Sequence, residues 1–218
     1  MPAISASAPG KIILFGEHAV VYHRPAIAVP VLQVHFRAAL FADPLAPAHT
    51  VWIDAPDIGL AARLDDLEPE HPIRFVFQQV MKVLNLTTFP SARVSLTSTI
   101  PLGSGLGSSS ASAVSLTRAI STFLGRPFPD DLVNRIAFET EKIHHGHPSG
   151  IDNTVITYEK PIFFIKDQPI EWLELAAPLH LVIADSGHAT STAEVVEDVH
   201  RHWTTQPDVY EHWFDEIG

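Results

Sequence analysis

Residues 93–125 read RVSLTSTIPLGSGLGSSSASAVSLTRAISTFLG, and their order predicts a strand, a glycine-rich loop and a helix. Apolar and polar side chains alternate from Arg93 to Ile100, as they do in a half-buried strand. After the loop, apolar residues recur at helical spacing as far as Phe123, and Gly125 is a suitable helix end. The stretch therefore predicts a loop of small residues between a strand and a helix N-terminus.

The loop at residues 101–112 has the composition of an anion-binding site. Its three alternate glycines allow backbone N–H groups to turn inward, and the following helix adds unpaired donors and partial positive charge. No Gly-Lys-Ser/Thr follows as in a Walker A loop, and Ser108 stands where the dinucleotide fingerprint requires glycine. Residues 108–110 are serines that could cap the helix or reach a nucleotide-bound Mg²⁺ ion. Phosphate binding is the functional interpretation, and a flexible Gly/Ser connection is the alternative.

The remaining segments mix strands and helices without a regular βαβ alternation, which predicts an α+β fold. The expected strands cover residues 3–14 (two strands around Pro9-Gly10), 26–41, 154–157, 162–165 and 180–184. The expected helices cover residues 73–84, 130 to about 146, and 193 to about 203.

The overall composition excludes several classes of partner. With 25 acidic residues against 14 Lys and Arg, the formal net charge of −11 opposes binding to nucleic acids and to anionic membranes. The absence of cysteine excludes disulfides and thiolate metal sites. No apolar run approaches the ~18 residues that span a bilayer. We therefore expect no nucleic-acid or membrane partner, and a cytoplasmic location.

Three charged residues are candidates for phosphoryl-transfer chemistry. Asp152 follows a Pro-Ser-Gly turn, where it could orient an attacking hydroxyl and accept its proton, or be only a turn residue. Lys11 could stabilise that carboxylate and neutralise the developing phosphoryl charge, or be a surface lysine at a strand end. Glu141 lies near the C-terminal end of a predicted helix, where its negative charge is unfavourable with the helix dipole unless a cation such as Mg²⁺ or Lys142 compensates it. The alternative is an ordinary surface charge.

Three strings together resemble the first signatures of the GHMP kinases, a family of small-molecule kinases. They are APGKIILFGEHAVVYHRPAIA (residues 8–28), PLGSGLGSSSAS (residues 101–112) and HHGHPSGIDN (residues 144–153). Within the family, GEHAVVY followed by RPAIA is most similar to the mevalonate kinase branch. The resemblance extends from about Ala6 to the helix after Asp185, which is nearly the whole chain.

The resemblance implies roles for individual residues. Asp152 corresponds to the catalytic aspartate, and Lys11 to the lysine that assists it. Ser109 and Glu141 correspond to two Mg²⁺ ligands.

The same resemblance implies two binding segments. Glu17 and His18 fall in the segment that lines the acceptor site, and Ser191-Thr192 resembles a second stretch on that side. The implied ATP-phosphate loop comprises Pro101, Leu102, Gly103, Ser104, Gly105, Leu106, Gly107, Ser108, Ser109, Ser110, Ala111 and Ser112.

The implied fold has two lobes. Residues 1–178 are expected to form the N-terminal ATP-binding lobe, related to ribosomal protein S5 domain 2. Residues 179–218 are expected to form only the beginning of a truncated, ferredoxin-like C-terminal lobe, because the family's C-terminal glycine-rich motif does not occur.

The implied reaction is Mg²⁺-dependent transfer of the γ-phosphoryl group of ATP to the 5-hydroxyl of mevalonate, which gives 5-phosphomevalonate. A kinase for another small alcohol, such as phosphomevalonate or a sugar, is one alternative, and an inactive nucleotide-binding fragment is another. A homodimer is compatible with the resemblance.

Overall fold

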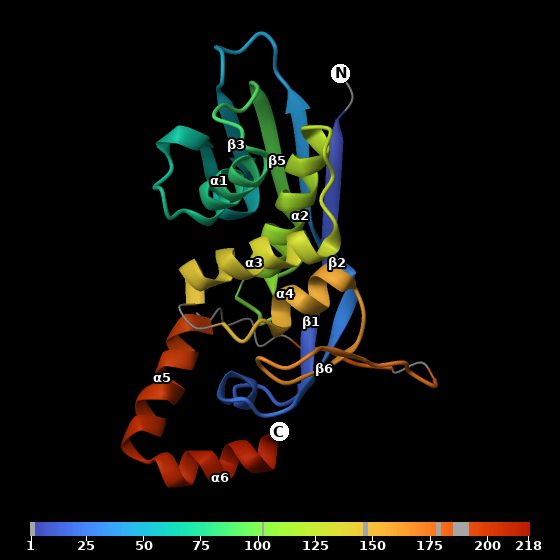
Figure 1. Cartoon of the computed structure of the whole chain (residues 1–218), viewed down its shortest axis with the longest axis vertical. Helices are drawn as coiled ribbons and strands as arrows, with labels where there is room; N and C mark the ends of the chain where they lie inside the picture. Colours follow the sequence, from blue (N-terminus) through green and yellow to red (C-terminus); the bar gives the residue numbers. More distant parts are fainter. Residues whose placement is uncertain (1–2, 102, 146–147, 178–179, 185–191) are drawn as a thin grey trace.

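The computed structural model describes residues 3–101, 103–145, 148–177, 180–184 and 192–218, with all their side chains except those of residues 144–145 and 192–194 (Figure 1). Its elements in chain order are β1 (Ile4–Phe15), η1 (Ala19–Tyr22), β2 (Ala26–Ala42), β3 (Val51–Ala55), η2 (Pro56–Ile58), β4 (Leu60–Arg63), η3 (Leu64–Asp66), α1 (Pro72–Leu84), β5 (Ala92–Ser98), α2 (Ser108–Phe123), α3 (Asp130–His145), α4 (Ile151–Tyr158), β6 (Ile162–Phe164), β7 (Glu171–Trp172), α5 (Thr192–Thr205) and α6 (Pro207–Ile217). The predicted α+β class is confirmed.

The strands form one mixed sheet in the order β4-β3-β5-β2-β6-β7, with β1 paired to β2. All pairings are antiparallel except β3 with β5. Strand β2 is long enough to pair with β5 through residues 36–42 and with β6 through residues 26–28. This long strand therefore joins the two ends of the sheet.

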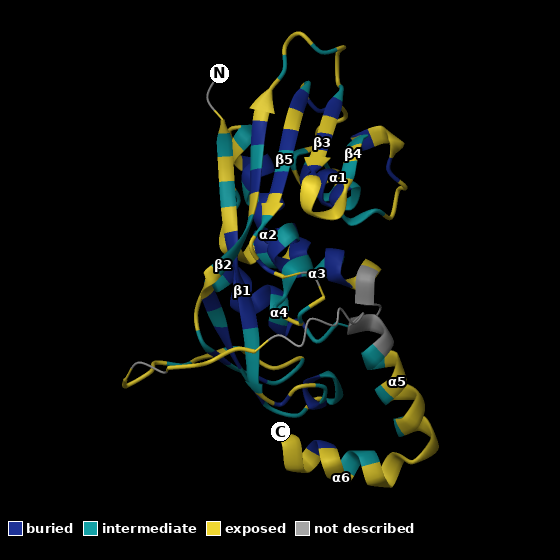
Figure 2. Ribbon diagram, turned by 180° about the vertical axis from the view of Figure 1, so that it is seen from behind, coloured by how far each residue is buried: buried dark blue, intermediate teal, exposed yellow. Residues whose placement is uncertain are grey.

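Helix α2 is the central element of the layer that covers the sheet. It packs on β1 and β2, and α1, α3 and α4 pack against it. Ala113, Leu116 and Ile120 on its inward face are at most 2% exposed. Figure 2 shows the resulting pattern, with buried positions alternating along β5 and β2 and exposed positions on α5 and α6. Burial of this face fixes the direction in which the N-terminus of α2 points.

The predicted amphipathic helix over residues 73–84 is confirmed as α1, and its buried residues include Ile73, Val76 and Val80. The predicted helix closed by Gly125 is confirmed as α2, and the one that begins at Asp130 is confirmed as α3. The expected strands at 26–41 and 162–165 match β2 and β6.

Three predictions from the sequence were wrong. Residues 3–14 form one strand, in which a register shift between Pro9 and Gly10 replaces the expected turn. Residues 154–157 are helical, because burial of Val155 and Ile156 against the other helices overrides their β propensity. Residues 180–184 form no regular strand, and Val182 is 99% exposed there.

The C-terminal residues add α5 and α6, and α6 was not anticipated from the sequence. Both helices extend away from the main body in Figure 1, and α6 lies beside the turn that contains η1. Among the residues that the structure describes, no helix combines the length and the apolarity needed to span a bilayer. The division of the chain at residue 178 stays a prediction.

Candidate active site

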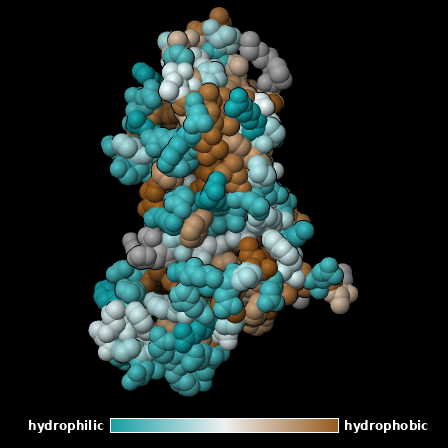
Figure 3. All heavy atoms as spheres, in the orientation of Figure 1, coloured by the Kyte–Doolittle hydropathy of each residue, from teal (hydrophilic) through white to brown (hydrophobic). Residues whose placement is uncertain are grey.

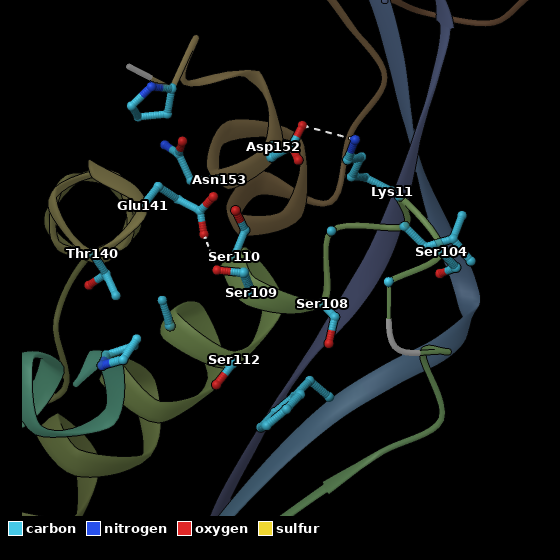
Figure 4. A pocket seen from close by; sticks show the side chains of 18 of the residues that line it. Lys11, Ser104, Ser108, Ser109, Ser110, Ser112, Thr140, Glu141, Asp152 and Asn153 are labelled. Carbon is cyan, nitrogen blue, oxygen red and sulfur yellow. Dashed lines mark hydrogen bonds and ion pairs between the residues drawn. The ribbon is translucent and has the colours of Figure 1, made fainter. Parts of the chain in front are cut away.

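Lys11 and Asp152 form an ion pair at the centre of the candidate site, with 3.0 Å between Nζ and Oδ1 (Figure 4). Lys11 comes from β1 and its side chain is 5% exposed, whereas Asp152 lies in the first turn of α4 and its side chain is 31% exposed. Burial lowers the pKa of Lys11, but the nearby carboxylates, first that of Asp152, outweigh it and leave this pKa raised. The pair therefore presents a carboxylate backed by a buried cation.

The glycine loop lies against this pair. The backbone N–H of Lys11 donates to the carbonyl of Leu106 at 3.0 Å, which ties the loop to β1. Gly103, Gly105 and Gly107 all have φ between 68° and 76°, and Gly107 is the N-cap of α2. The loop thus leads directly into a helix N-terminus, where free N–H groups favour an anion.

Ser109 and Glu141 form a second polar pair beside the first. Ser109 Oγ, in the first turn of α2, donates to Glu141 Oε1 of α3 at 2.6 Å (Figure 4). Burial raises the pKa of Glu141 to about 7, against the lowering effect of the Ser109 hydrogen bond. The charge of Asp152 also contributes to this raised value. A cation at this position would relieve the cost of the buried carboxylate.

The oxygen donors of Ser109 and Glu141 suit Mg²⁺. A hydroxyl and a carboxylate are hard oxygen ligands, and Mg²⁺ is commonly held by one or two protein oxygens together with substrate phosphates. In the described part of the chain, no three His, Cys, Asp or Glu side chains gather as a metal site. An ion at Ser109 and Glu141 would therefore need ligands from a nucleotide or from water.

A cavity of about 730 Å³ connects these features, within the ~300–1,000 Å³ of small-molecule sites. Both polar pairs line it, together with Glu17 and His18 from the turn after β1. Ten residues of the expected phosphate loop line it as well: Pro101, Gly103, Ser104, Gly105, Leu106, Gly107, Ser108, Ser109, Ser110 and Ser112.

Comparison with known proteins supports a single family. The family described as "GHMP kinases N terminal domain" matches residues 73–160. The mevalonate kinase of Thermococcus sibiricus is 31% identical over 99% of this chain, which covers 67% of that protein. The chain belongs to the GHMP kinase family. Other curated mevalonate kinases that it matches are covered over 64–66% of their length, so the chain spans about two thirds of these relatives.

Solved structures of mevalonate kinases share this fold. The Methanococcus jannaschii mevalonate kinase superposes with a TM-score of 0.78 at 20% identity, over 99% of this chain and 70% of that one. The L. major mevalonate kinase in complex with R-mevalonate superposes with a TM-score of 0.70 at 26% identity, over 98% of this chain and 65% of that one. The likeness includes α5 and α6, since both superpositions cover almost the whole chain.

One residue expected from the GHMP kinase resemblance lies outside the cavity, and three others fall wholly or partly outside the described residues. Ala111 is fully buried in the core and does not line the cavity. Leu102 and Ser191 lie outside the described residues, as does the side chain of Thr192, although its backbone begins α5. The expected substrate-side role of Thr192 therefore stays a prediction.

Sequence reasoning missed the residues that form the apolar walls of the cavity. Ile73 and Val76 on α1 and Val195 and Val196 on α5 line it. Their only signal was helical periodicity, which identifies a buried face without telling whether that face meets the core or a ligand. Asn153 was also missed; it is 3% exposed and donates through Nδ2 to Asn134 Oδ1 at 2.6 Å, which joins α4 to α3.

Glu141→Gln is expected to raise the free energy of unfolding at pH 8 and to leave it close to that of the unaltered chain at pH 5, without metal or nucleotide. The folded-state pKa of about 7 exceeds the ordinary 4.5, so the folded chain binds the extra proton between these values. Stability of the unaltered chain therefore falls as pH rises through this window, and the amide removes that loss. Urea unfolding at both pH values measures the difference.

Glu139→Gln, on the exposed face of the same helix, is the matched control. A Glu141→Gln variant that is equally destabilised at pH 5 and pH 8 would contradict the prediction. Saturating Mg²⁺ and a non-hydrolysable ATP analogue should reverse the sign at pH 8, because bound cation favours the carboxylate.

Proposed function

We propose that the chain catalyses transfer of the γ-phosphoryl group of ATP to the 5-hydroxyl of mevalonate, giving 5-phosphomevalonate and ADP. The observation that carries the proposal is the Lys11–Asp152 pair, which lies in the same cavity as a glycine loop that opens a helix. A carboxylate for a hydroxyl and a cradle for phosphates are the two parts that phosphoryl transfer requires. The chain spans about two thirds of the length of these relatives, so their activity does not transfer to it directly and is stated for this chain as a proposal.

We assign a chemical role to each of these residues from its position in the cavity. Asp152 orients the hydroxyl and takes its proton as the new O–P bond forms and the bond to the leaving ADP oxygen breaks. Lys11 balances the negative charge beside it. The N–H groups of the loop and of the first turn of α2 hold the phosphates.

Mg²⁺, when bound with the nucleotide, would supply charge neutralisation at the phosphates, and Ser109 and Glu141 are the residues that would hold it. The acceptor assignment has a separate basis: the relatives described above are named mevalonate kinases, and one similar structure contains R-mevalonate. Glu17 and His18 line the cavity where that acceptor would lie. The cytoplasmic location and the homodimer stay predictions.

The purified chain is expected to release ADP from Mg-ATP in a mevalonate-dependent manner, with kcat/KM at least about tenfold higher for mevalonate than for galactose, homoserine or phosphomevalonate. The reason is that a site built to hydrogen-bond one acceptor leaves polar groups unpaired with the others. A coupled ADP-release assay over the four acceptors measures it.

EDTA and omission of the acceptor are the controls for metal dependence and for background ATP hydrolysis. If another acceptor is turned over faster than mevalonate, that small alcohol is the substrate and the assignment of mevalonate is wrong. ATP binding without turnover of any acceptor would contradict the proposal in favour of a nucleotide-binding fragment.

A further inference from the structure

The turn between β1 and β2, residues 16–25, carries Glu17 and His18. We call the part of the cavity that these two residues line its acceptor end, because the proposed function places the acceptor there. Glu17 and His18 line the cavity from this turn, and η1 follows them. Its internal backbone hydrogen bonds include Val20 N–H to the carbonyl of Gly16 at 3.0 Å and Arg24 N–H to that of Ala19 at 3.2 Å. Gly16, Ala19 and Val20 are buried and anchor the middle of the turn, and contacts from α6 add to them.

Arg24 provides such contacts by joining the turn to α6. Its Nη2 lies 2.5 Å from Glu211 Oε2, and its Nε donates to Asp215 Oδ1 at 2.8 Å. Its Nη1 donates to the carbonyl of Tyr22 at 2.8 Å. One planar guanidinium therefore connects two carboxylates on successive turns of α6 with the backbone of the turn.

Aromatic packing reinforces the same junction. The rings of Tyr22 and Phe214 stack with centroids 4.2 Å apart and an interplanar angle of 15°. Phe214 is 3% exposed, although it comes from a helix whose other side faces solvent. Trp203 of α5 approaches Tyr22 at 5.2 Å and donates through Nε1 to Glu211 Oε1 at 2.9 Å. The packed face of α6 is thus directed at the turn.

The same pair of helices also contacts the cavity. Val195 and Val196 of α5 line it, so the α5–α6 hairpin bounds the cavity at one helix and contacts the turn at the other. The face of the hairpin that Figure 3 shows is mostly hydrophilic, whereas Phe214 is buried and stacks on Tyr22 at the junction with the turn. Figure 1 shows that α6 lies beside the turn in space, although the two segments are far apart in the sequence.

We propose that Arg24 is a positioning residue that clamps the 16–25 turn to α6 and so fixes Glu17 and His18 at the acceptor end of the cavity. The contact between the turn and α6 is a property of the fold alone, whereas its effect on acceptor binding rests on the proposed function. Among the described residues, the side-chain hydrogen bonds of Arg24 go to Tyr22, Glu211 and Asp215 and to none of α2 or the glycine loop. Loss of the clamp should therefore weaken acceptor binding selectively.

The test compares the unaltered chain with Arg24→Ala, Arg24→Lys and the double variant Glu211→Ala/Asp215→Ala. In Arg24→Ala and in the double variant, amide hydrogen exchange of residues 16–25 is expected to speed up about tenfold, with residues 108–123 unchanged. KM for mevalonate should rise about tenfold, while KM for ATP stays within about threefold. Arg24→Lys should recover only part of the effect, because an ammonium cannot hold both carboxylates in the same geometry.

Arg201→Ala is the matched control, since Arg201 lies on α5 and, within the described part of the chain, its side chain pairs with the exposed Asp198 three residues away. Unchanged exchange of residues 16–25 in Arg24→Ala would overturn the clamp. Faster exchange with an unchanged KM for mevalonate would overturn the positioning role. An unaltered chain without turnover would count against the proposed function, and the exchange comparison would still decide the clamp.

Discussion

Asp152→Asn is expected to reduce kcat for mevalonate-dependent ADP release by about 10³-fold. The amide keeps the shape of the side chain but can neither accept the proton of the hydroxyl nor balance the charge of Lys11. The carboxylate is the exposed member of a pair whose other member is buried, so it is the one available to a substrate. Steady-state kinetics with Mg-ATP and mevalonate measure the loss.

The same substitution leaves a buried ammonium without its carboxylate, so folding has to be measured in parallel. Breaking a fully buried pair costs ~3–5 kcal/mol, and the 31% exposure of Asp152 should make the cost here smaller. Asp43→Asn is the matched control, because it also breaks a carboxylate–cation pair, with 2.8 Å between Asp43 Oδ2 and Arg93 Nε. Asp43 directly follows the C-terminal end of β2 and does not line the cavity. A folded Asp152→Asn variant that keeps a tenth of the turnover would contradict the role of Asp152 as base.

Gly107→Ala is expected to lower kcat by about 10²-fold and to reduce the free energy of unfolding by about 3 kcal/mol. Gly107 has φ of +76°, which is strained for alanine, and a Cβ there would lie 2.8 Å from Lys11 Cγ and from Ile156 Cδ1. Both neighbours are side-chain atoms, so the side chains must move. Movement of Lys11 displaces the partner of Asp152 from its position. Kinetics and urea unfolding measure the two effects.

Gly125→Ala separates the two causes. Gly125 has a similar φ of +73°, at the other end of α2, and a Cβ there would meet nothing within 4 Å. This variant should lose only the ~1–2 kcal/mol of backbone strain and keep its turnover. Equal effects of the two substitutions on kcat would show that the close contact between Gly107 and Lys11 is unimportant.

The parts of the fold that the sequence predicted are those with a strong local pattern. Helix α1 was predictable because Ile73, Val76 and Val80 repeat at the spacing of one helix face. Helix α2 was predictable because a glycine loop precedes it and Gly125 follows it. The α4 helix was missed because its β-branched residues favour a strand locally, and only packing against α2 and α3 makes it helical.

The candidate site divides in the same way. The sequence by itself determined which residues could take part: Lys11, the glycine-rich loop, Glu141 and Asp152, which follow one another in the order that the GHMP kinase resemblance implies. Motif spacing carries this information because a loop and the helix it opens are neighbours in the chain.

Only the tertiary structure decided which of these groups meet and in what state. It placed Lys11 3.0 Å from Asp152 and Glu141 next to Ser109, where burial raises the pKa of Glu141 to about 7. It also brought α6 to Arg24, which no local pattern indicated. The physical reason is that distance, burial and charge coupling between residues far apart in the chain depend on how helices pack on the sheet, and local sequence does not encode that packing.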